Sequence, residues 1–161
     1  MGAVGASLGE IEAVYRSRGE AFYKLALART EQRDLARDAV QEGFARAIRS
    51  RDSFRREGSL EAWIARCVIN AAHDLVARHD KPNPDAATAG ACHARPDSDE
   101  WVREAVRRLP RRQREALFLR FYLDFDYITI AATLGVEVGT VSATLHAARA
   151  ALSNEIREVP Q

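Results

Sequence analysis

The chain has 161 residues, of which 47% are hydrophobic and 29% are charged, and its formal net charge at pH 7 is +1. These values are typical of a soluble globular protein, and the length suits one domain or two small ones. No apolar run approaches the roughly 18 residues that a membrane-spanning helix needs. Residues 1–7 also lack the basic and apolar regions of a signal peptide. The sequence therefore predicts a cytoplasmic protein.

The sequence shows neither the ligand pattern of a metal site nor the residue pattern of a catalytic site. The two cysteines, Cys67 and Cys92, are too few for a disulfide framework and lack the C-x-x-C spacing of a zinc site. His93 beside Cys92 does not provide the four ligands of a tetrahedral zinc ion. No nucleophile with a partner base and no phosphate-binding loop is apparent. We therefore expect no metal, no cofactor and no enzymatic activity.

The composition and the apolar periodicity predict an all-α fold, because good helix formers dominate and no segment alternates as a strand does. In the first half of the chain the predicted helices cover 9–17, 19–30, 33–50 and 59–79. At about 100° per residue, the helix over 33–50 has one apolar face, made of Leu35, Ala36, Ala39, Val40, Phe44 and Ala47. Its opposite face carries Asp38, Gln41 and Glu42.

The helix over 59–79, which Ser59 caps, also divides into two faces. The predicted buried stripe is Leu60, Ile64, Val68, Ala71, Ala72 and Leu75, and the opposite arc carries Trp63, Arg66, Asn70, His73 and Asp74. Just upstream, Arg49, Arg51, Arg55 and Arg56 flank Phe54 in a loop. Aromatic, basic and amide groups together suit single-stranded nucleic acid. An ordinary solvent-exposed helix face, with Trp63 half-buried against a neighbouring part of the protein, is the alternative interpretation of the same residues.

Residues 81–98 separate this half from the rest. They contain three prolines, a glycine and no large apolar side chain, which predicts a flexible linker. The predicted organisation is therefore two small helical domains, 1–80 and 99–161, joined by this linker.

The second half predicts a helix-turn-helix. A helix starts near Asp97 and Glu100, which are spaced as in a capping box, and a second begins at Pro110. Asp126 caps a short helix that ends before Gly135, and a last helix begins near Gly139. A short helix, a glycine turn and a longer helix in this order are the elements of a helix-turn-helix.

Two separated segments resemble one protein family. The pattern Asp38, Gln41, Glu42 and Phe44 resembles the polymerase-binding helix of bacterial sigma factors of the extracytoplasmic-function (ECF) group. The segment from Arg51 through Arg78 is similar to their promoter-melting, −10-reading segment. The segment LPRRQREAL (109–117) and the helix-turn-helix after it resemble their −35-binding domain. Since both resemblances occur in the family's order, the chain is identified as a member of this group.

The resemblance implies three sets of site residues. Those expected to bind core polymerase are Asp38, Gln41 and Glu42. Those expected to bind the −10 element are Phe54, Arg55, Arg56, Trp63, Arg66 and Asn70. Those expected at the −35 element are Thr140, Ser142, Ala143, Thr144, Ala147 and Arg149. The implied partners are core RNA polymerase, promoter DNA and an anti-sigma factor.

The last helix departs from the family pattern. Where the family usually has lysine or arginine, this chain has Ser142, Thr144 and Ala147. Each lost phosphate contact removes roughly one counterion's worth of salt-dependent affinity. From Phe121 onward, five acidic residues stand against two arginines. Two functions therefore stay open: a sigma factor that directs initiation, and a sigma-like interaction protein that binds polymerase or an anti-sigma factor without efficient promoter recognition.

Overall fold

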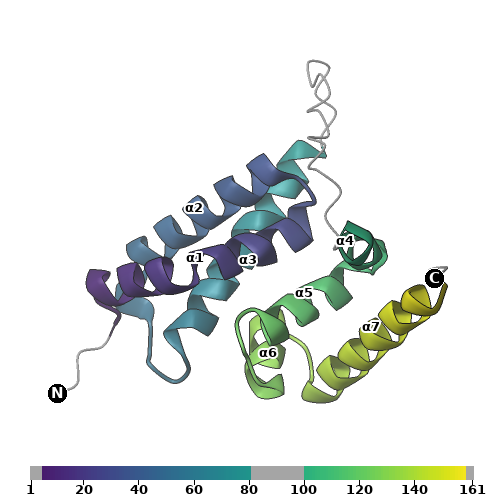
Figure 1. The fold of residues 1–161 in the computed structure, drawn as a ribbon. Coiled ribbons are helices and arrows are strands. Elements are labelled where there is room, and N and C mark those ends of the chain that lie inside the picture. The colour runs from purple at the N-terminus through teal and green to yellow at the C-terminus, as the bar shows by residue number, and fades with distance from the viewer. Residues whose placement is uncertain (1–4, 81–99, 159–161) are drawn as a thin grey trace.

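The computed structural model describes residues 5–80 and 100–158, and across these two ranges all regular structure is helical (Figure 1). The predicted all-α class is confirmed. An N-terminal domain contains α1–α3 and a C-terminal domain contains α4–α7. The predicted linker 81–98, with Cys92, His93 and Asp97 in it, lies outside the described residues.

The N-terminal domain is a bundle of α1 (Leu8–Thr30), α2 (Arg33–Arg49) and α3 (Leu60–His79), with the short 3₁₀ helix η1 (Arg51–Ser53) after α2. The apolar face predicted for α2 is buried throughout, and Ile64, Val68, Ala71 and Ala72 form the buried centre of α3. The Ser59 hydroxyl caps α3 by accepting from the Ala62 amide at 3.1 Å. These contacts set the polar faces of α2 and α3 on the outside of the bundle.

Helix α1 differs from its prediction. The sequence predicted two helices that meet at residue 18, but the structure has one helix of 23 residues. A glycine inside a helix costs about 1 kcal/mol relative to alanine. Ile11 and Phe22 are fully buried on either side of Gly19, and burying such side chains contributes about 1.5–3 kcal/mol each. Tertiary packing therefore outweighs the local penalty.

Helices α2 and α3 cross in direct backbone contact at Gly43. A Cβ atom at this position would lie 2.6 Å from Val68 Cα, closer than real Cβ atoms come to their neighbours. Only the absence of a side chain permits this approach. The contact fixes the polar face of α2 relative to α3.

The C-terminal domain contains α4 (Glu100–Arg108), α5 (Arg111–Phe121), α6 (Tyr127–Leu134) and α7 (Val138–Glu158). Asp126 caps α6 by accepting from the Thr129 amide at 2.7 Å, and Gly135 ends it in the left-handed region with φ 67°. The predicted helix-turn-helix is therefore present as α6 and α7. Val141, Leu145 and Ala148 form the buried face of α7.

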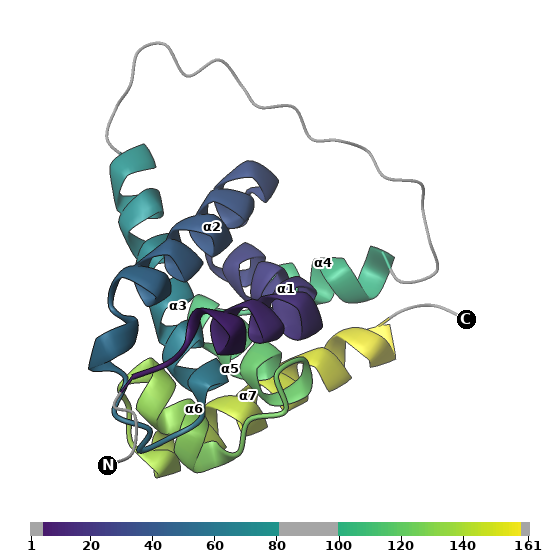
Figure 2. The ribbon, with the colours of Figure 1, turned by 90° about the vertical axis from the view of Figure 1, so that its left-hand side faces the viewer.

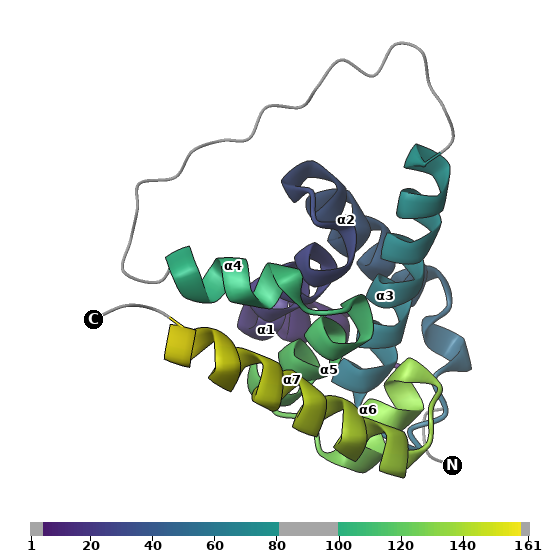
Figure 3. The ribbon, with the colours of Figure 1, turned by 90° about the vertical axis from the view of Figure 1, so that its right-hand side faces the viewer.

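The two domains pack against each other. Helix α5 lies on α1, and α6 lies beside α3, as two views at right angles to Figure 1 show (Figure 2, Figure 3). The sequence did not predict this arrangement, because nothing in its periodicity relates one half to the other.

Over the described ranges, no single helix combines the length and the apolar character needed to cross a membrane. Among the helices that the structure describes, α6 and α7 reach that limit as a pair, and these two helices are bent by 101° relative to each other.

Candidate functional site

The outer face of α2 presents two of its three predicted site residues to solvent. Asp38 and Gln41 are exposed, whereas Glu42 is half-buried. The Glu42 carboxylate accepts from Arg46 Nε at 2.8 Å and from Arg49 at 3.2 Å. The hydrogen bond from Arg46 is the main cause that lowers the pKa of Glu42. This face therefore carries an ionised Glu42 at one end and the exposed Asp38 and Gln41 beside it.

Arg46 also connects this face to α3. Its guanidinium donates to the Asp74 carboxylate at 2.8 Å, and this hydrogen bond is the largest cause that lowers the pKa of Asp74. The sequence placed Asp74 on the solvent arc of α3, but the structure gives it a structural ion pair.

Phe54, which the resemblance places in the −10-binding set, is buried in this structure. Its side chain is only 6% exposed, and its ring centroid lies 5.4 Å from that of Trp63. The backbone of this segment is fixed as well, because the Gly5 amide donates to the Phe54 carbonyl at 3.1 Å. The loop thus turns its one large apolar side chain into the core, and Phe54 supports Trp63 while Arg55 remains exposed.

Arg56 follows in the left-handed region, with φ 58°. Its guanidinium donates to both oxygens of Glu10, at 3.0 and 3.1 Å. Glu10 also closes the capping box of α1 by accepting from the Ser7 amide at 2.8 Å. These bonds, first that with Arg56, lower the pKa of Glu10 to about 2. Glu10, which the sequence did not single out, thus holds the loop to the start of α1.

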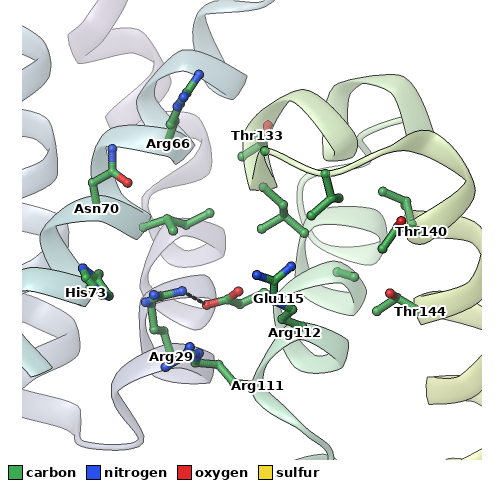
Figure 4. A pocket seen from close by; sticks show the side chains of 16 residues that line it. Arg29, Arg66, Asn70, His73, Arg111, Arg112, Glu115, Thr133, Thr140 and Thr144 are labelled. Carbon is green, nitrogen blue, oxygen red and sulfur yellow. Dashed lines mark hydrogen bonds and ion pairs between the residues drawn. The ribbon is translucent and has the colours of Figure 1, made fainter.

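The outer face of α3 looks toward the C-terminal domain. Arg66, Asn70 and His73 are exposed, and Trp63 is half-buried. Arg66 and Asn70 line a pocket of about 320 Å³ between the domains, and Thr140 and Thr144 of α7 line its opposite wall (Figure 4). The structure thus brings together parts of the predicted −10 and −35 sets across one pocket.

The predicted −35 residues of α7 divide between two surfaces. Thr140, Ser142, Ala143 and Ala147 are exposed, and Thr144 is half-buried. Arg149 lies apart from them, with its guanidinium 5.7 Å from the Phe121 ring centroid. It lines an apolar groove of about 480 Å³ between α4, α5 and α7, together with Val106, Leu117, Phe118, Phe121, Tyr122, Leu152 and Ser153.

Two charged residues of α5 make the central contact between the domains. Arg114 is 7% exposed, and its guanidinium donates to the carbonyls of Ala28 at 2.9 Å and Leu109 at 3.0 Å. It also lies 2.6 Å from the Glu31 carboxylate. The Glu115 carboxylate, 3% exposed, forms an ion pair with Arg29.

The sequence reasoning missed these residues. Arg114 does precede Leu117 and Phe118 at helical spacing, which places it on the apolar side of α5. This spacing is the one signal by which its burial could have been found.

Models of protein families match both domains. Residues 14–81 match the model described as Sigma-70 region 2, and residues 99–152 match the model described as Sigma-70, region 4. The chain is 30% identical to the RNA polymerase sigma-H factor of Pseudomonas aeruginosa, over 76% of this chain and 73% of that protein. It is 32% identical to the ECF RNA polymerase sigma factor EcfG of Rhodopseudomonas palustris, over 80% and 75%.

Two solved structures share the fold. The complex of the sigma factor RpoE with the anti-sigma factor NepR from Bartonella quintana gives a TM-score of 0.76 at 22% identity, covering 95% of this chain and 100% of that one. CnrH in complex with the cytosolic domain of CnrY gives 0.70 at 20% identity, covering 96% and 92%.

Proposed function

This chain belongs to the ECF group of RNA polymerase sigma factors, and on that premise we propose that it binds core polymerase, recognises promoter DNA and opens the duplex for initiation. The observation that carries the proposal is the outer surface of the N-terminal domain. One rigid bundle presents Asp38 and Gln41 on α2, and Arg66 and Asn70 on α3. Two different macromolecules can therefore be held by two faces of fixed relative orientation.

The α2 face is proposed to contact core polymerase. Asp38 and Gln41 are exposed on a helix whose other side is buried, so they are available without any change in the bundle. Glu42, held by Arg46 and Arg49, is proposed to lie at the edge of this contact as a carboxylate of fixed orientation.

The loop and the outer face of α3 are proposed to bind the unpaired strand. Among the described residues, neither Arg55 nor Arg66 has an ion pair, so both guanidinium groups are available to phosphates. Trp63, whose ring centroid lies 5.4 Å from that of Phe54, offers a ring for stacking, and Asn70 offers an exposed amide that can hydrogen-bond to a base. Ring stacking combined with positive charge is how proteins bind single strands.

The C-terminal domain is proposed to contribute less to promoter choice. The exposed part of α7 that leads a helix-turn-helix into the major groove carries Thr140, Ser142, Ala143 and Ala147, none of them charged. Methyl contacts with thymine remain available to such a surface. The uncharged face supports the alternative function as well, namely binding of polymerase or of an anti-sigma factor without efficient promoter recognition.

Control by an anti-sigma factor is also proposed. The two structural neighbours described above were solved as complexes with NepR and CnrY, of which NepR is described as an anti-sigma factor. A shared fold gives this chain comparable surfaces for such a partner, but it does not identify one.

Transcription with purified core polymerase and a library of promoter sequences tests the main proposal. Discrete start sites that depend on this chain are expected. Binding to core polymerase with no transcript would favour the interaction protein instead.

The strand-contacting face has its own test. Asn70→Ala should reduce the permanganate reactivity of the melted strand while core binding stays unchanged. Asn154→Ala, an exposed asparagine on α7, serves as the matched control. An unaltered footprint with Asn70→Ala would remove Asn70 from the proposed contact.

A further inference from the structure

The pocket between the two domains is strongly basic (Figure 4). Its volume is about 320 Å³, at the low end of the range for small-molecule sites. Four arginines line it against a single carboxylate, so its lining carries a net charge of +3 when the one histidine is counted as neutral. The charged lining residues are Arg29 on α1, Arg66 on α3, and Arg111, Arg112 and Glu115 on α5.

Three of these arginines have no counter-charge in the protein. Glu115 forms an ion pair with Arg29, which neutralises that one guanidinium. The side chains of Arg66, Arg111 and Arg112 are exposed, and within the described residues they have neither an ion pair nor a side-chain hydrogen bond. Like charges around one cavity repel each other. An anion bound among the three guanidinium groups would remove this repulsion.

Neutral donors border the same pocket. Asn70 on α3 and Thr140 and Thr144 on α7 line it, and their amide and hydroxyl groups can donate to the oxygens of an anion. Thr140 also lies in the first turn of α7, which begins at Val138. The unpaired amides of a helix N-terminus carry partial positive charge and favour anions. The α7 wall therefore adds to the attraction that the arginines of α3 and α5 exert.

The chemistry of the lining selects among anions. Guanidinium groups pair with phosphate through two parallel hydrogen bonds. Each phosphate group carries about −1.5 to −2 near pH 7, so two of them match the positive charge of the lining. None of the described residues that line the pocket is aromatic, so a nucleobase would find no ring on which to stack. The lining thus favours a small diphosphate over a nucleotide or a DNA strand.

We propose that this pocket binds a small non-aromatic molecule with two phosphate groups, held by Arg66 of the N-terminal domain and by Arg111 and Arg112 of the C-terminal domain. Such binding is independent of the proposed function, because it requires neither polymerase nor DNA. Failure of transcription would therefore leave this site unaffected.

Isothermal titration calorimetry with inorganic pyrophosphate, in magnesium-free buffer and on the full-length chain, tests the site. One pyrophosphate per chain is expected. Arg66→Gln and Arg112→Gln should each weaken binding by about tenfold, the scale of one charge-assisted contact. Arg33→Gln is the matched control, because Arg33 is also exposed and without an ion pair among the described residues but does not line the pocket. Its affinity should equal that of the wild type.

Circular dichroism checks that each variant is folded, and Arg111→Gln replaces Arg112→Gln if the latter loses helicity. The absence of binding in the millimolar range would overturn the proposal. Losses of equal size in Arg33→Gln and in the pocket variants would overturn it as well. A loss confined to the variant of one domain would overturn the placement of the ligand between the two domains.

Two further probes determine what the site selects. Sulfate, a single tetrahedral anion, should bind at least about tenfold more weakly than pyrophosphate, since it can engage fewer of the guanidinium groups. Equal affinity for both would indicate an adventitious ion only. A short single strand of thymidine nucleotides should bind Arg112→Gln as it binds the wild type. If strand affinity fell with Arg112→Gln as far as pyrophosphate affinity does, the pocket would belong to a nucleic-acid path, and the small-molecule assignment would be wrong.

Discussion

Glu10 and Arg56 lie 46 positions apart in the sequence and form two hydrogen bonds, of 3.0 and 3.1 Å, between the start of α1 and the loop that precedes α3. The pair fixes the one arginine of that loop whose backbone is in the left-handed region, with φ 58°. Strained backbone of this kind persists only where surrounding contacts determine it. Glu10 is therefore a positioning residue for the loop that we propose to contact DNA.

Glu10→Gln is expected to lower the melting temperature slightly at pH 7, and this difference from the wild type should vanish in acid. The pKa of Glu10 falls from its ordinary value of 4.5 to about 2 in the folded chain. A lowered carboxyl pKa stabilises the folded state fully above the unfolded value, and this stabilisation is lost as pH falls through the folded value. The contribution is thus complete above about pH 4.5 and disappears toward pH 2. Thermal melts of both proteins across this range provide the measurement.

The double change Glu10→Gln with Arg56→Gln is the control for that experiment. If the two residues stabilise the chain through their mutual contact, the double variant should lose less stability than the sum of the losses in the two single variants. Strict additivity would show that the two residues act independently.

Gly43→Ala should destabilise the N-terminal domain by about 1–3 kcal/mol, the usual cost of forcing an extra carbon into a packed core. The new Cβ would lie 2.6 Å from Val68 Cα and Cγ2, and backbone atoms cannot yield as a flexible side chain can. Gly19→Ala is the contrasting variant, because its Cβ meets only Tyr15 Cε2 at 4.0 Å. That change should stabilise by up to about 1 kcal/mol through helix propensity. Urea denaturation of the two variants should therefore give shifts of opposite sign.

Asp38→Ala with Gln41→Ala should weaken binding to core polymerase by about tenfold, the scale of one or two interface residues that each matter by about 1 kcal/mol. Both side chains are exposed, so circular dichroism should not change. The matched control is Glu12→Ala with Glu20→Ala, which removes two exposed side chains from α1. Equal affinity of the α2 variant and the wild type in a core-binding titration would rule out this face.

Adding positive charge to α7 should convert its uncharged face into a stronger DNA-binding surface. Ser142→Lys, Thr144→Arg and Ala147→Arg together should raise duplex affinity and steepen its dependence on the logarithm of salt concentration. Each new phosphate contact adds about −0.9 to that slope, or about −2.7 in all. Asn154→Lys, a single exposed change farther along the same helix, should alter both quantities less. Tight binding of a specific duplex by the wild-type C-terminal domain would show instead that the uncharged face reads sequence.

Local patterns in the sequence were enough to predict the helices and their buried faces. The apolar residues of α2 recur with the helical period, and all six predicted members are buried because one face of a helix must meet the core. Asp126 caps the start of α6 and Gly135 ends it, and each of these roles can be predicted from the residue type alone.

Contacts that leave no periodic pattern in the sequence could not be predicted in this way. Phe54 lies in a loop, where neither a helical nor a strand pattern distinguishes buried from exposed side chains, so its burial was missed. Arg29 and Glu115 are 86 positions apart, and no local rule relates residues so distant. The assignment of the three sets of site residues came from family resemblance and stays a prediction, which the variants above test.

Helix α1 is continuous from Leu8 to Thr30, and at 1.5 Å per residue it spans about 34 Å. Glu10 near one end holds the loop at Arg56, and Arg29 near the other end meets α5. A break at Gly19 would have left these ends mechanically independent. Because α1 is one continuous helix, the length of that helix sets a fixed separation between its two anchored ends, one at the loop and one at α5.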